Sequence, residues 1–401
     1  MSYKVLSKVY YQDKEEYEKI LSERLTSENT TFLNIKIHEN EAFYCLNQEI
    51  YDLTFKIMEA DKKVQVIKEN LPGVALEHFA NKSLVDEIFL TNDIEGVRST
   101  RKEIKIIINE SEEPQKKKKN RRFYGLVTKY MMLSGARIGL RTCEDVRKIY
   151  DELVLPEITA DDPDKVPDGK IYRKDLSEVT TTTQKVIHRG VYPEEKIIDY
   201  MERALKILND DNINILIRIS IFHYLFGYIH PFYDGNGRTS RFISSYLLST
   251  YLDDLIGYRL SYTIKENLND YNEAFSICNN NKNKGDITPF IIKFLKIISI
   301  AFEKLYEALY DRKVFLEEML NKIKTVECFC NEEMYSLCGY LVQAKLFSAD
   351  GIAKRDLCEL LKISETTLRK RLKVIEEEGF LTEKRVGTHK YFAFDVEKLN
   401  Y

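Results

Sequence analysis

Fourteen consecutive residues, IHPFYDGNGRTSRF from Ile229 to Phe242, gather side chains suited to phosphate chemistry. They include one histidine, one aspartate, an asparagine between two glycines, and two arginines three residues apart. Apolar helical patterns on both sides predict a turn between two buried helices, with the glycines leading into the second helix. Backbone amides and the helix dipole at such an N-terminus favour negative charge. The pattern therefore indicates a polyphosphate site.

Each polar residue of the turn suits one role at such a site. Arg238 and Arg241 share the first turn of the second helix and could contact phosphates together. Asp234 could hold Mg²⁺, which prefers one or two carboxylates with phosphate oxygens. His230 at the rim is a candidate general base. Taken singly, such a histidine is usually structural and DGNG is usually only a turn, so the prediction depends on their combination.

The stretch HPFYDGNGRTSR resembles the signature of the Fic family, HPFx(D/E)GNGRxxR, and matches it at every fixed position. Residues 169–193 (GKIYRKDLSEVTTTTQKVIHRGVYP) are similar to the family's flap, and residues 271–295 to its later helix pair. The resemblance covers about residues 85–310. It implies a mainly α fold, in which a Fic-type helical core carries a small β-hairpin flap.

Members of this family typically transfer AMP from ATP to a Ser, Thr or Tyr hydroxyl of a target protein. The resemblance implies that His230 takes the hydroxyl proton, that Asp234 binds Mg²⁺ and that Phe232 anchors the loop in the core. It also implies a nucleotide cradle: the α- and β-phosphates at Gly235, Asn236 and Gly237, and the outer phosphates at Arg238 and Arg241.

The resemblance extends, with fewer matching positions, to the target and to the nucleoside. The flap would pair with the target's backbone as an added strand. Its contact residues would be Lys185, Val186, Ile187 and His188. The adenosine would lie against Tyr271, Asn272 and Asn279. The flap has Tyr192-Pro193 in place of the proline pair common in the family, which leaves the identity of the target open.

TNDIEG, residues 91–96, resembles the family's inhibitory motif, (S/T)xxxE(G/N), and lies N-terminal to the core as that motif does. In such proteins the glutamate pairs with the second arginine of the signature, here Glu95 with Arg241. The arginine is then not available to the γ-phosphate, because charge-assisted pairing competes for it. We expect Glu95 to obstruct AMP transfer, or to orient a water that removes AMP. The alternative is that Glu95 is an ordinary solvated residue at a helix end.

The last part of the chain has a different pattern. A helix over Met334–Phe347, a second over AKRDLCELLKI, a Ser364 cap with a third helix, and two short strands around Gly387 follow in the order of a winged helix-turn-helix. The third helix begins with basic residues, but three glutamates follow them. DNA and protein therefore both stay open as partners of this domain.

Composition limits the alternatives. Lys and Arg number 61 against 64 Asp and Glu, which argues against a surface built throughout for nucleic acid or anionic lipid. The first residues lack an apolar signal-peptide core, and seven cysteines without CxxC spacing argue against a disulfide framework. The apolar run 213–229 contains polar residues and suits a buried helix. We expect a cytoplasmic protein with reduced thiols and no membrane contact.

We expect four regions along the chain: an N-terminal helical region carrying the inhibitory helix at 1–110, the Fic core at 111–312, a linker helix at 313–333 and the winged helix at 334–401. The basic run at Lys116–Arg122 is either a solvated loop or a nucleic-acid patch.

Two functions fit these patterns. The first is a self-inhibited adenylyltransferase that uses ATP and Mg²⁺ and modifies a target protein or itself, with a homodimer left open. The second is a DNA-binding regulator whose core senses a nucleotide. A variant with another donor is a further alternative. The intact His230 favours the enzyme, because a sensor needs no base there.

Overall fold

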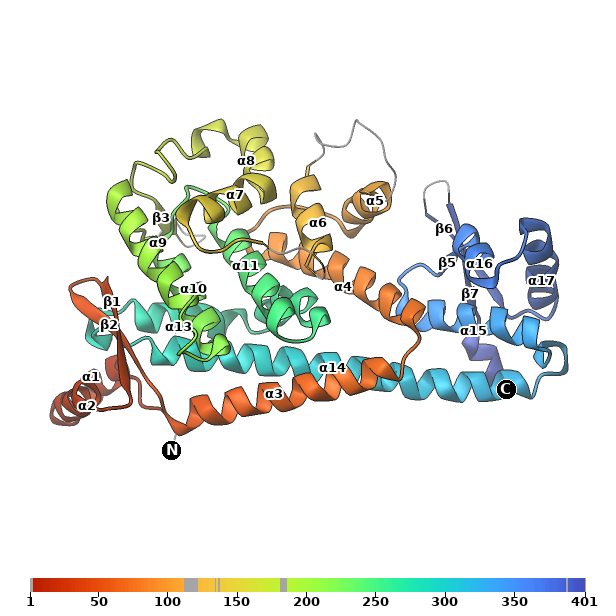
Figure 1. Ribbon diagram of the computed structural model, residues 1–401, viewed down its shortest axis with the longest axis horizontal. Coiled ribbons are helices and arrows are strands. Elements are labelled where there is room, and N and C mark those ends of the chain that lie inside the picture. The colour runs from red at the N-terminus through yellow and green to blue at the C-terminus, as the bar shows by residue number, and fades with distance from the viewer. Residues whose placement is uncertain are drawn as a thin grey trace. The chain divides into compact units, whose positions relative to one another are not determined.

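The computed structural model describes residues 3–111, 122–133, 135, 138–180, 186–386 and 389–400, and it is mainly helical (Figure 1). The chain divides into two units, one made of residues 1–61 and 85–303 and the other of residues 62–84 and 304–401. Three long helices contribute residues to both units: α3 (Gln48–Glu69), α4 (Gly73–Ile94) and α14 (Thr288–Lys324).

The first unit is built around α10 (Ile215–Ile229), which packs against α9 (Glu194–Leu208) and α11 (Asn236–Tyr251). α10 is apolar on every side, and nearly all of its residues are buried. This confirms the prediction of a buried helix and places the loop after Ile229 against the core. No helix in the described ranges has both the length and the apolar character needed to cross a bilayer.

Shorter helices surround this centre. They are α5 (Arg101–Ser111), α6 (Tyr124–Met131), α7 (Cys143–Leu153), α8 (Leu155–Asp161), α12 (Leu260–Glu266) and α13 (Leu268–Cys278). α5 begins with a capping box, since Thr100 and Glu103 exchange hydrogen bonds. Single 3₁₀ turns follow several of the helices, among them η2 (Pro163–Lys165) directly after α8.

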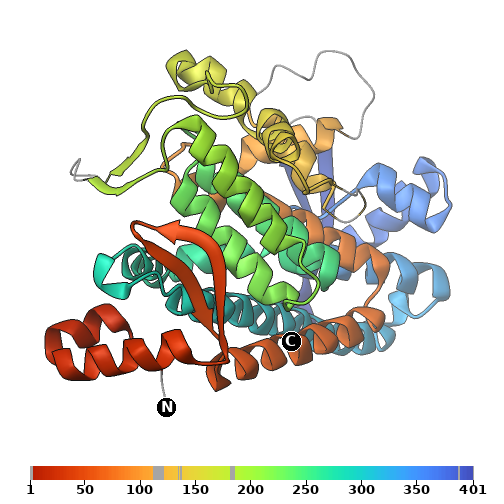
Figure 2. The ribbon, with the colours of Figure 1, turned by 60° about the vertical axis from the view of Figure 1, so that its left-hand side comes forward.

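The predicted flap is a two-stranded antiparallel ribbon of β3 (Glu178–Thr180) and β4 (Val186–Arg189). Figure 2 shows it extending from the helical body next to α9. Of the predicted flap residues, Lys185 lies outside the described residues, as does most of the basic run Lys116–Arg122.

The N-terminal region is less uniformly helical than the sequence analysis predicts. After α1 (Leu6–Gln12) and α2 (Lys14–Thr26), β1 (Thr30–Ile37) and β2 (Asn40–Cys45) form an antiparallel hairpin. The hairpin packs against α9, and β2 also bonds to the chain before α14, where Phe43 N donates to the Gly285 carbonyl at 3.0 Å. The physical reason is visible in β1, whose buried residues alternate with exposed ones as in a half-buried strand.

Asp286 ties the N-terminal segment to the start of α14. Its carboxylate is fully buried and accepts hydrogen bonds from the Tyr3 hydroxyl at 2.6 Å and from Arg24 Nη1 at 2.8 Å. Its other oxygen accepts from the Thr288 backbone N–H at 2.9 Å and so caps the helix. One side chain therefore neutralises a cation and satisfies the end of a helix.

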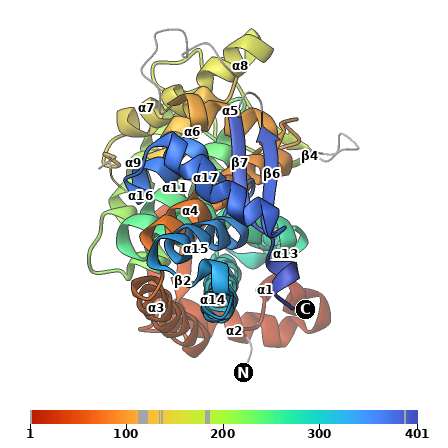
Figure 3. The ribbon, with the colours of Figure 1, turned by 90° about the vertical axis from the view of Figure 1, so that its right-hand side faces the viewer.

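The second unit contains α15 (Glu332–Phe347), β5 (Ile352–Ala353), α16 (Lys354–Leu361), α17 (Glu365–Glu377), β6 (Leu381–Val386), β7 (His389–Phe394) and the 3₁₀ turn η6 (Val396–Asn400) (Figure 3). The strands form an antiparallel sheet in the order β5-β7-β6. Ser364 caps α17, as predicted, by accepting from the Thr367 N–H. α14 continues unbroken to Lys324, so most of the segment expected as a separate linker helix is the end of that helix.

Replacing Asp286 by Ala should lower the free energy of unfolding by about 3–5 kcal/mol, because it leaves a buried arginine without its partner. Chemical denaturation followed by circular dichroism measures this. Asp199→Ala is the matched control, since Asp199 pairs with Arg203 on the surface at 2.9 Å and should contribute less than about 1 kcal/mol. Equal losses in the two variants would contradict the role given to Asp286.

Candidate active site

The signature forms a tight loop between α10 and α11. α10 ends at His230, whose backbone is left-handed (φ 53°), and Gly235 (φ 78°) precedes the first turn of α11. Asn236 closes this loop with its side chain: its Oδ1 accepts from Phe232 N at 3.0 Å and its Nδ2 donates to the Phe232 carbonyl at 2.7 Å. The Asn236 amide therefore holds the loop, and any contact with phosphate here falls to the backbone.

Phe232 fixes the loop to the core. Its ring is fully buried, stacks on Tyr150 with ring centres 3.6 Å apart, and meets the edge of Tyr172. This is the anchoring role that the sequence analysis expects of Phe232. The loop is therefore held both by an aromatic stack and by the Asn236 amide, which makes it a rigid support for the groups on it.

His230 is partly buried and its imidazole is neutral. Burial, together with the nearby His188 and Arg173, lowers its pKa to about 3. Arg173 is fully buried and its Nε donates to the His230 carbonyl at 2.9 Å, which places that positive charge next to the ring. A neutral imidazole is the form that can accept a proton.

Arg241 is held entirely by the end of α4. Its Nη1 donates to Glu95 Oε1 at 2.8 Å, its Nε to Thr91 Oγ1 at 2.8 Å, and its Nη2 to the Thr91 carbonyl at 3.0 Å. Burial opposes the charge of Arg241, but Glu95, together with Tyr271 and Tyr130, outweighs this and raises its pKa. The structure thus brings Glu95 onto Arg241, as the motif predicts, and not into solvent.

Gly237 is the reason why Glu95 can come so close. A Cβ built on Gly237 would lie 2.1 Å from Glu95 Oε1, and the three nearest atoms all belong to Glu95. A residue with any side chain at this position would therefore collide with the carboxylate. The second glycine of the signature serves the contact with Glu95 as well as the approach of a ligand.

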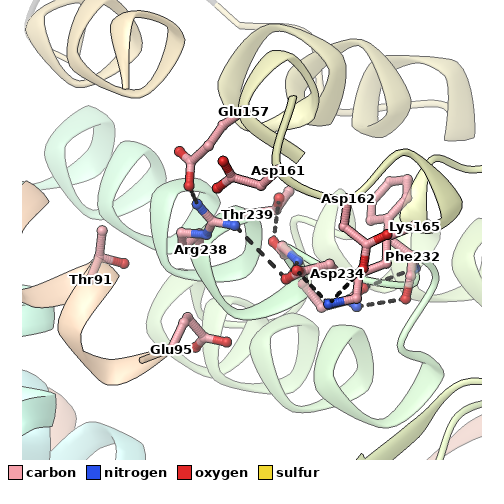
Figure 4. Close-up of polar contacts among 12 residues, drawn as sticks. Thr91, Glu95, Glu157, Asp161, Asp162, Lys165, Phe232, Asp234, Arg238 and Thr239 are labelled. Carbon is pink, nitrogen blue, oxygen red and sulfur yellow. Dashed lines mark hydrogen bonds and ion pairs between the residues drawn. The ribbon is translucent and has the colours of Figure 1, made fainter. Parts of the chain in front are cut away.

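Arg238 has a partner that the sequence analysis does not predict. Its Nη1 donates to Glu157 Oε1 at 2.9 Å, and Figure 4 shows Glu157 extending from α8 to this arginine. Both side chains are almost fully buried. Burial raises the pKa of Glu157, while Arg238 opposes that rise. No local pattern in LPEITAD marks this glutamate, which is 81 positions before Arg238.

Asp234 is the most exposed of the charged residues on the loop, with 37% of its side chain accessible. Lys165 Nζ lies 3.6 Å from Oδ2, and Arg238 Nη2 lies 3.8 Å from Oδ1 (Figure 4). The described residues contain no group of three His, Cys, Asp or Glu side chains that could hold a metal. A single accessible carboxylate beside a phosphate site nevertheless fits Mg²⁺, which keeps several waters and takes phosphate oxygens as ligands.

The flap and the expected adenosine residues meet at His188 and Asn279. His188 Nε2 donates to the Tyr228 carbonyl at 2.7 Å, which leaves Nδ1 as an acceptor 3.4 Å from Asn279 Nδ2. The Tyr224 hydroxyl donates to Asn279 Oδ1 at 2.8 Å, so both ends of this amide are oriented. Val186 and Ile187 on β4 are exposed, as strand addition by a target would require.

Tyr271 and Asn272, the other two residues expected at the adenosine, differ in their exposure. The Tyr271 hydroxyl is hydrogen-bonded to the buried His223 at 2.7 Å, so it is part of the core. Asn272 is exposed on α13.

The unpredicted β1–β2 hairpin does reach this end of the site, because His38 Nε2 donates to the Asn279 carbonyl at 2.8 Å. Periodicity of two in β1 is the signal that could have revealed the hairpin, though not the contact.

The imidazole of His230 should remain neutral from pH 8 down to about pH 5, because its pKa is lowered to about 3. Protonation would fill the free nitrogen of the ring, so this shift keeps the side chain able to accept a proton across that range. NMR of ¹⁵N-histidine-labelled protein measures it, with His230→Gln assigning the signal. A titration midpoint near pH 6.5, the ordinary pKa of histidine, would show that neither burial nor Arg173 lowers the pKa of this ring.

Gly237→Ala should displace Glu95 from Arg241 and should stabilise the protein less than the same change does in the Glu95→Ala background. With Glu95 present the new methyl collides with its carboxylate. Without Glu95, alanine should stabilise α11 by up to about 1 kcal/mol, since it is the better helix former. A double-mutant cycle of unfolding free energies gives the coupling, and additive effects would mean that Glu95 does not occupy this position.

Comparisons with known proteins bear on this loop and its surroundings. Residues 142–248 match the model of the Fic/DOC family, a shorter range than the resemblance of the sequence suggests. Proteins named "Protein adenylyltransferase Fic" from Drosophila erecta and Drosophila yakuba are each 34% identical over 94 residues, which is 23% of this chain. The chain matches only 17% of the length of those relatives.

The fold has a counterpart among solved structures. A Fic family protein from Desulfovibrio desulfuricans G20 aligns with a TM-score of 0.53 over 88% of this chain and 97% of that one, at 19% identity, which bears on the fold alone. The family match, the loop geometry and this likeness agree. Residues 142–248 form a Fic/DOC family domain.

Proposed function

We propose that the protein is an adenylyltransferase that transfers AMP from ATP to a Ser, Thr or Tyr hydroxyl of a target protein, or of itself. The observation that carries the proposal is a neutral imidazole, His230, held beside a helix N-terminus with two buried arginines. The identity to proteins named as adenylyltransferases supports ATP as the donor.

In the proposed reaction, His230 accepts the proton of the target hydroxyl as its oxygen attacks the α-phosphorus. A new O–P bond forms, the bond between the α-phosphorus and the bridging oxygen breaks, and pyrophosphate leaves with the electron pair. Backbone amides at Gly235 and Gly237, the dipole of α11 and the signature arginines would stabilise the charge on the phosphates. Such transfers ask mainly for positioning and for neutralisation of charge.

Asp234 would hold Mg²⁺ from the open side of the loop, and the ion would neutralise charge on the leaving pyrophosphate. Lys165 now lies 3.6 Å from this carboxylate and 3.5 Å from Asp162. Its ammonium group can therefore turn to Asp162 when another cation takes Asp234, so the carboxylate is accessible without any change of backbone.

We further propose that Glu95 inhibits the enzyme. All three nitrogens of the Arg241 guanidinium donate to Glu95 or Thr91, so a γ-phosphate would have to compete with Glu95 for this arginine. Glu95 is 30% exposed whereas Arg241 is 1% exposed, and the glutamate is therefore the partner that can leave. Glu95 is also placed to orient a water that removes AMP from a modified target.

The second unit would choose targets or location as a winged helix. The order helix, strand, helix, helix, hairpin supports this assignment. Several of its cations are already paired, including Arg371 with Glu333, and Lys384 with Asp350 at 2.5 Å. This pairing leaves less free charge for phosphate and supports a protein partner over DNA.

The test uses ATP labelled at the α-phosphate, with Mg²⁺ and candidate target proteins, and follows the label in protein bands. Glu95→Gly should raise labelling several-fold or more over the wild type, because it frees Arg241. His230→Ala in that background should abolish the labelling. Asp93→Gly is the matched control, since Asp93 lies near the same helix end and pairs with Lys265 at 2.6 Å.

Strong labelling in Glu95→Gly alone would support both the transfer and its inhibition. Equal labelling in Glu95→Gly and Asp93→Gly would contradict inhibition by Glu95. No labelling in any lane, with ATP still bound, would count against AMP transfer and would favour another donor or a nucleotide-sensing regulator.

A further inference from the structure

Both signature arginines are paired with a carboxylate, and the two pairs differ. Arg241 is bound by Glu95, the residue directly after α4, and Arg238 is bound by Glu157 from α8. The first pair corresponds to a motif in the sequence, but the second does not. Figure 4 shows Glu95 and Glu157 reaching the start of α11 from separate elements. The question is what the second carboxylate does.

The exposure of the two glutamates separates their roles. Glu95 is 30% exposed and can move into water. Glu157 is 6% exposed and faces an arginine that is 1% exposed. Separating this second pair would leave two charges in a poorly solvated place, which is far more costly than releasing a half-solvated one. Glu157 is therefore a permanent partner of Arg238 and not a removable one.

The contacts of Glu157 leave most of the guanidinium available. Glu157 Oε1 accepts a hydrogen bond from Arg238 Nη1 at 2.9 Å. Nε has no hydrogen-bond partner among the described residues although it is buried, and Nη2 lies 3.8 Å from Asp234 Oδ1, too far for a good hydrogen bond. A buried donor without a partner is uncommon and calls for a ligand or water. The unused donors include the one directed toward Asp234, where the phosphates would lie.

Two arginines hold Glu157 in place and oppose the rise in its pKa that burial causes. Arg122 Nη2 lies 3.9 Å from Glu157 Oε1 and 3.4 Å from Asp161 Oδ2. The carboxylate is thus shared between a buried arginine and a half-exposed one. Nearby positive charge favours the ionised form of a buried carboxyl group. Arg122 therefore contacts two acidic residues of α8, Glu157 and the more exposed Asp161.

We propose that Glu157 is a positioning residue. Its hydrogen bond with Nη1 orients Arg238 so that the remaining N–H groups can donate to the phosphates of the nucleotide. It stays paired while the nucleotide is bound, in contrast to Glu95, which must leave. This inference rests on the proposed function for the identity of the nucleotide. It acts through Arg238 and touches no reacting atom itself.

The experiment measures the Kd of ATP by calorimetry, with and without Mg²⁺, in the Glu95→Gly background. Glu157→Gln keeps the size of the side chain and an oxygen acceptor but removes the charge. We expect about tenfold weaker ATP binding, a loss at the low end of that seen when the hydrogen-bond partner of a metal-binding side chain is removed. Glu152→Gln on α7, whose partner is Lys129, is the control and should leave the Kd unchanged.

A double-mutant cycle with Arg238→Gln separates positioning from a general structural role. If Glu157 acts through Arg238, Glu157→Gln should weaken ATP binding no further once Arg238 is replaced. Circular dichroism of each variant checks that it is folded. Unchanged Kd in folded Glu157→Gln, or the same loss with and without Arg238, would overturn the proposal.

AMP transfer measured on the same variants tests the proposed function separately from the positioning role of Glu157. Faster transfer in Glu157→Gln would make Glu157 a second inhibitory residue and would overturn its positioning role. A shift of Kd without AMP transfer in any variant would support the positioning role and count against the proposed function. Absence of ATP binding in the Glu95→Gly background would overturn both.

Discussion

The first two turns of α11 bury two guanidinium groups, and the rest of the candidate site depends on neutralising them. A buried charge is tolerated only with a partner of opposite sign and good geometry. Those partners come from α4 and α8, which are 146 and 81 positions away along the chain. The same two ion pairs therefore bring distant segments to the loop and set the charge that a ligand meets there.

Without nucleotide, the charges at this loop balance. Arg238, Arg241 and Lys165 face Glu157, Glu95 and Asp234. A polyphosphate adds several negative charges, so the balance can be kept only if a carboxylate leaves or a cation arrives. Glu95 is the carboxylate most easily released, and Asp234 is the carboxylate most accessible to a cation. The proposed release of Glu95 and the proposed binding of Mg²⁺ would thus both offset the negative charge that the polyphosphate adds.

Local patterns predicted the local parts of this structure. The buried helix α10, the loop between α10 and α11 and the Ser364 cap follow from periodicity and capping residues. Glu95 was recognisable because a motif marks it. Glu157 was not, because an ion pair between distant segments leaves no trace in either segment alone. The β1–β2 hairpin was missed because strongly helical neighbours obscured its short alternation.

Arg173 links the flap to the candidate base. It is fully buried, and its guanidinium donates to the carbonyls of His230, at 2.9 Å, and Val191, at 2.8 Å. Burial lowers its own pKa to about 10, which still leaves it charged at neutral pH. The cation therefore discourages a proton on His230 while its hydrogen bonds fix the chain that follows β4. A target aligned on the flap would thus meet a base whose position and protonation state depend on the same arginine.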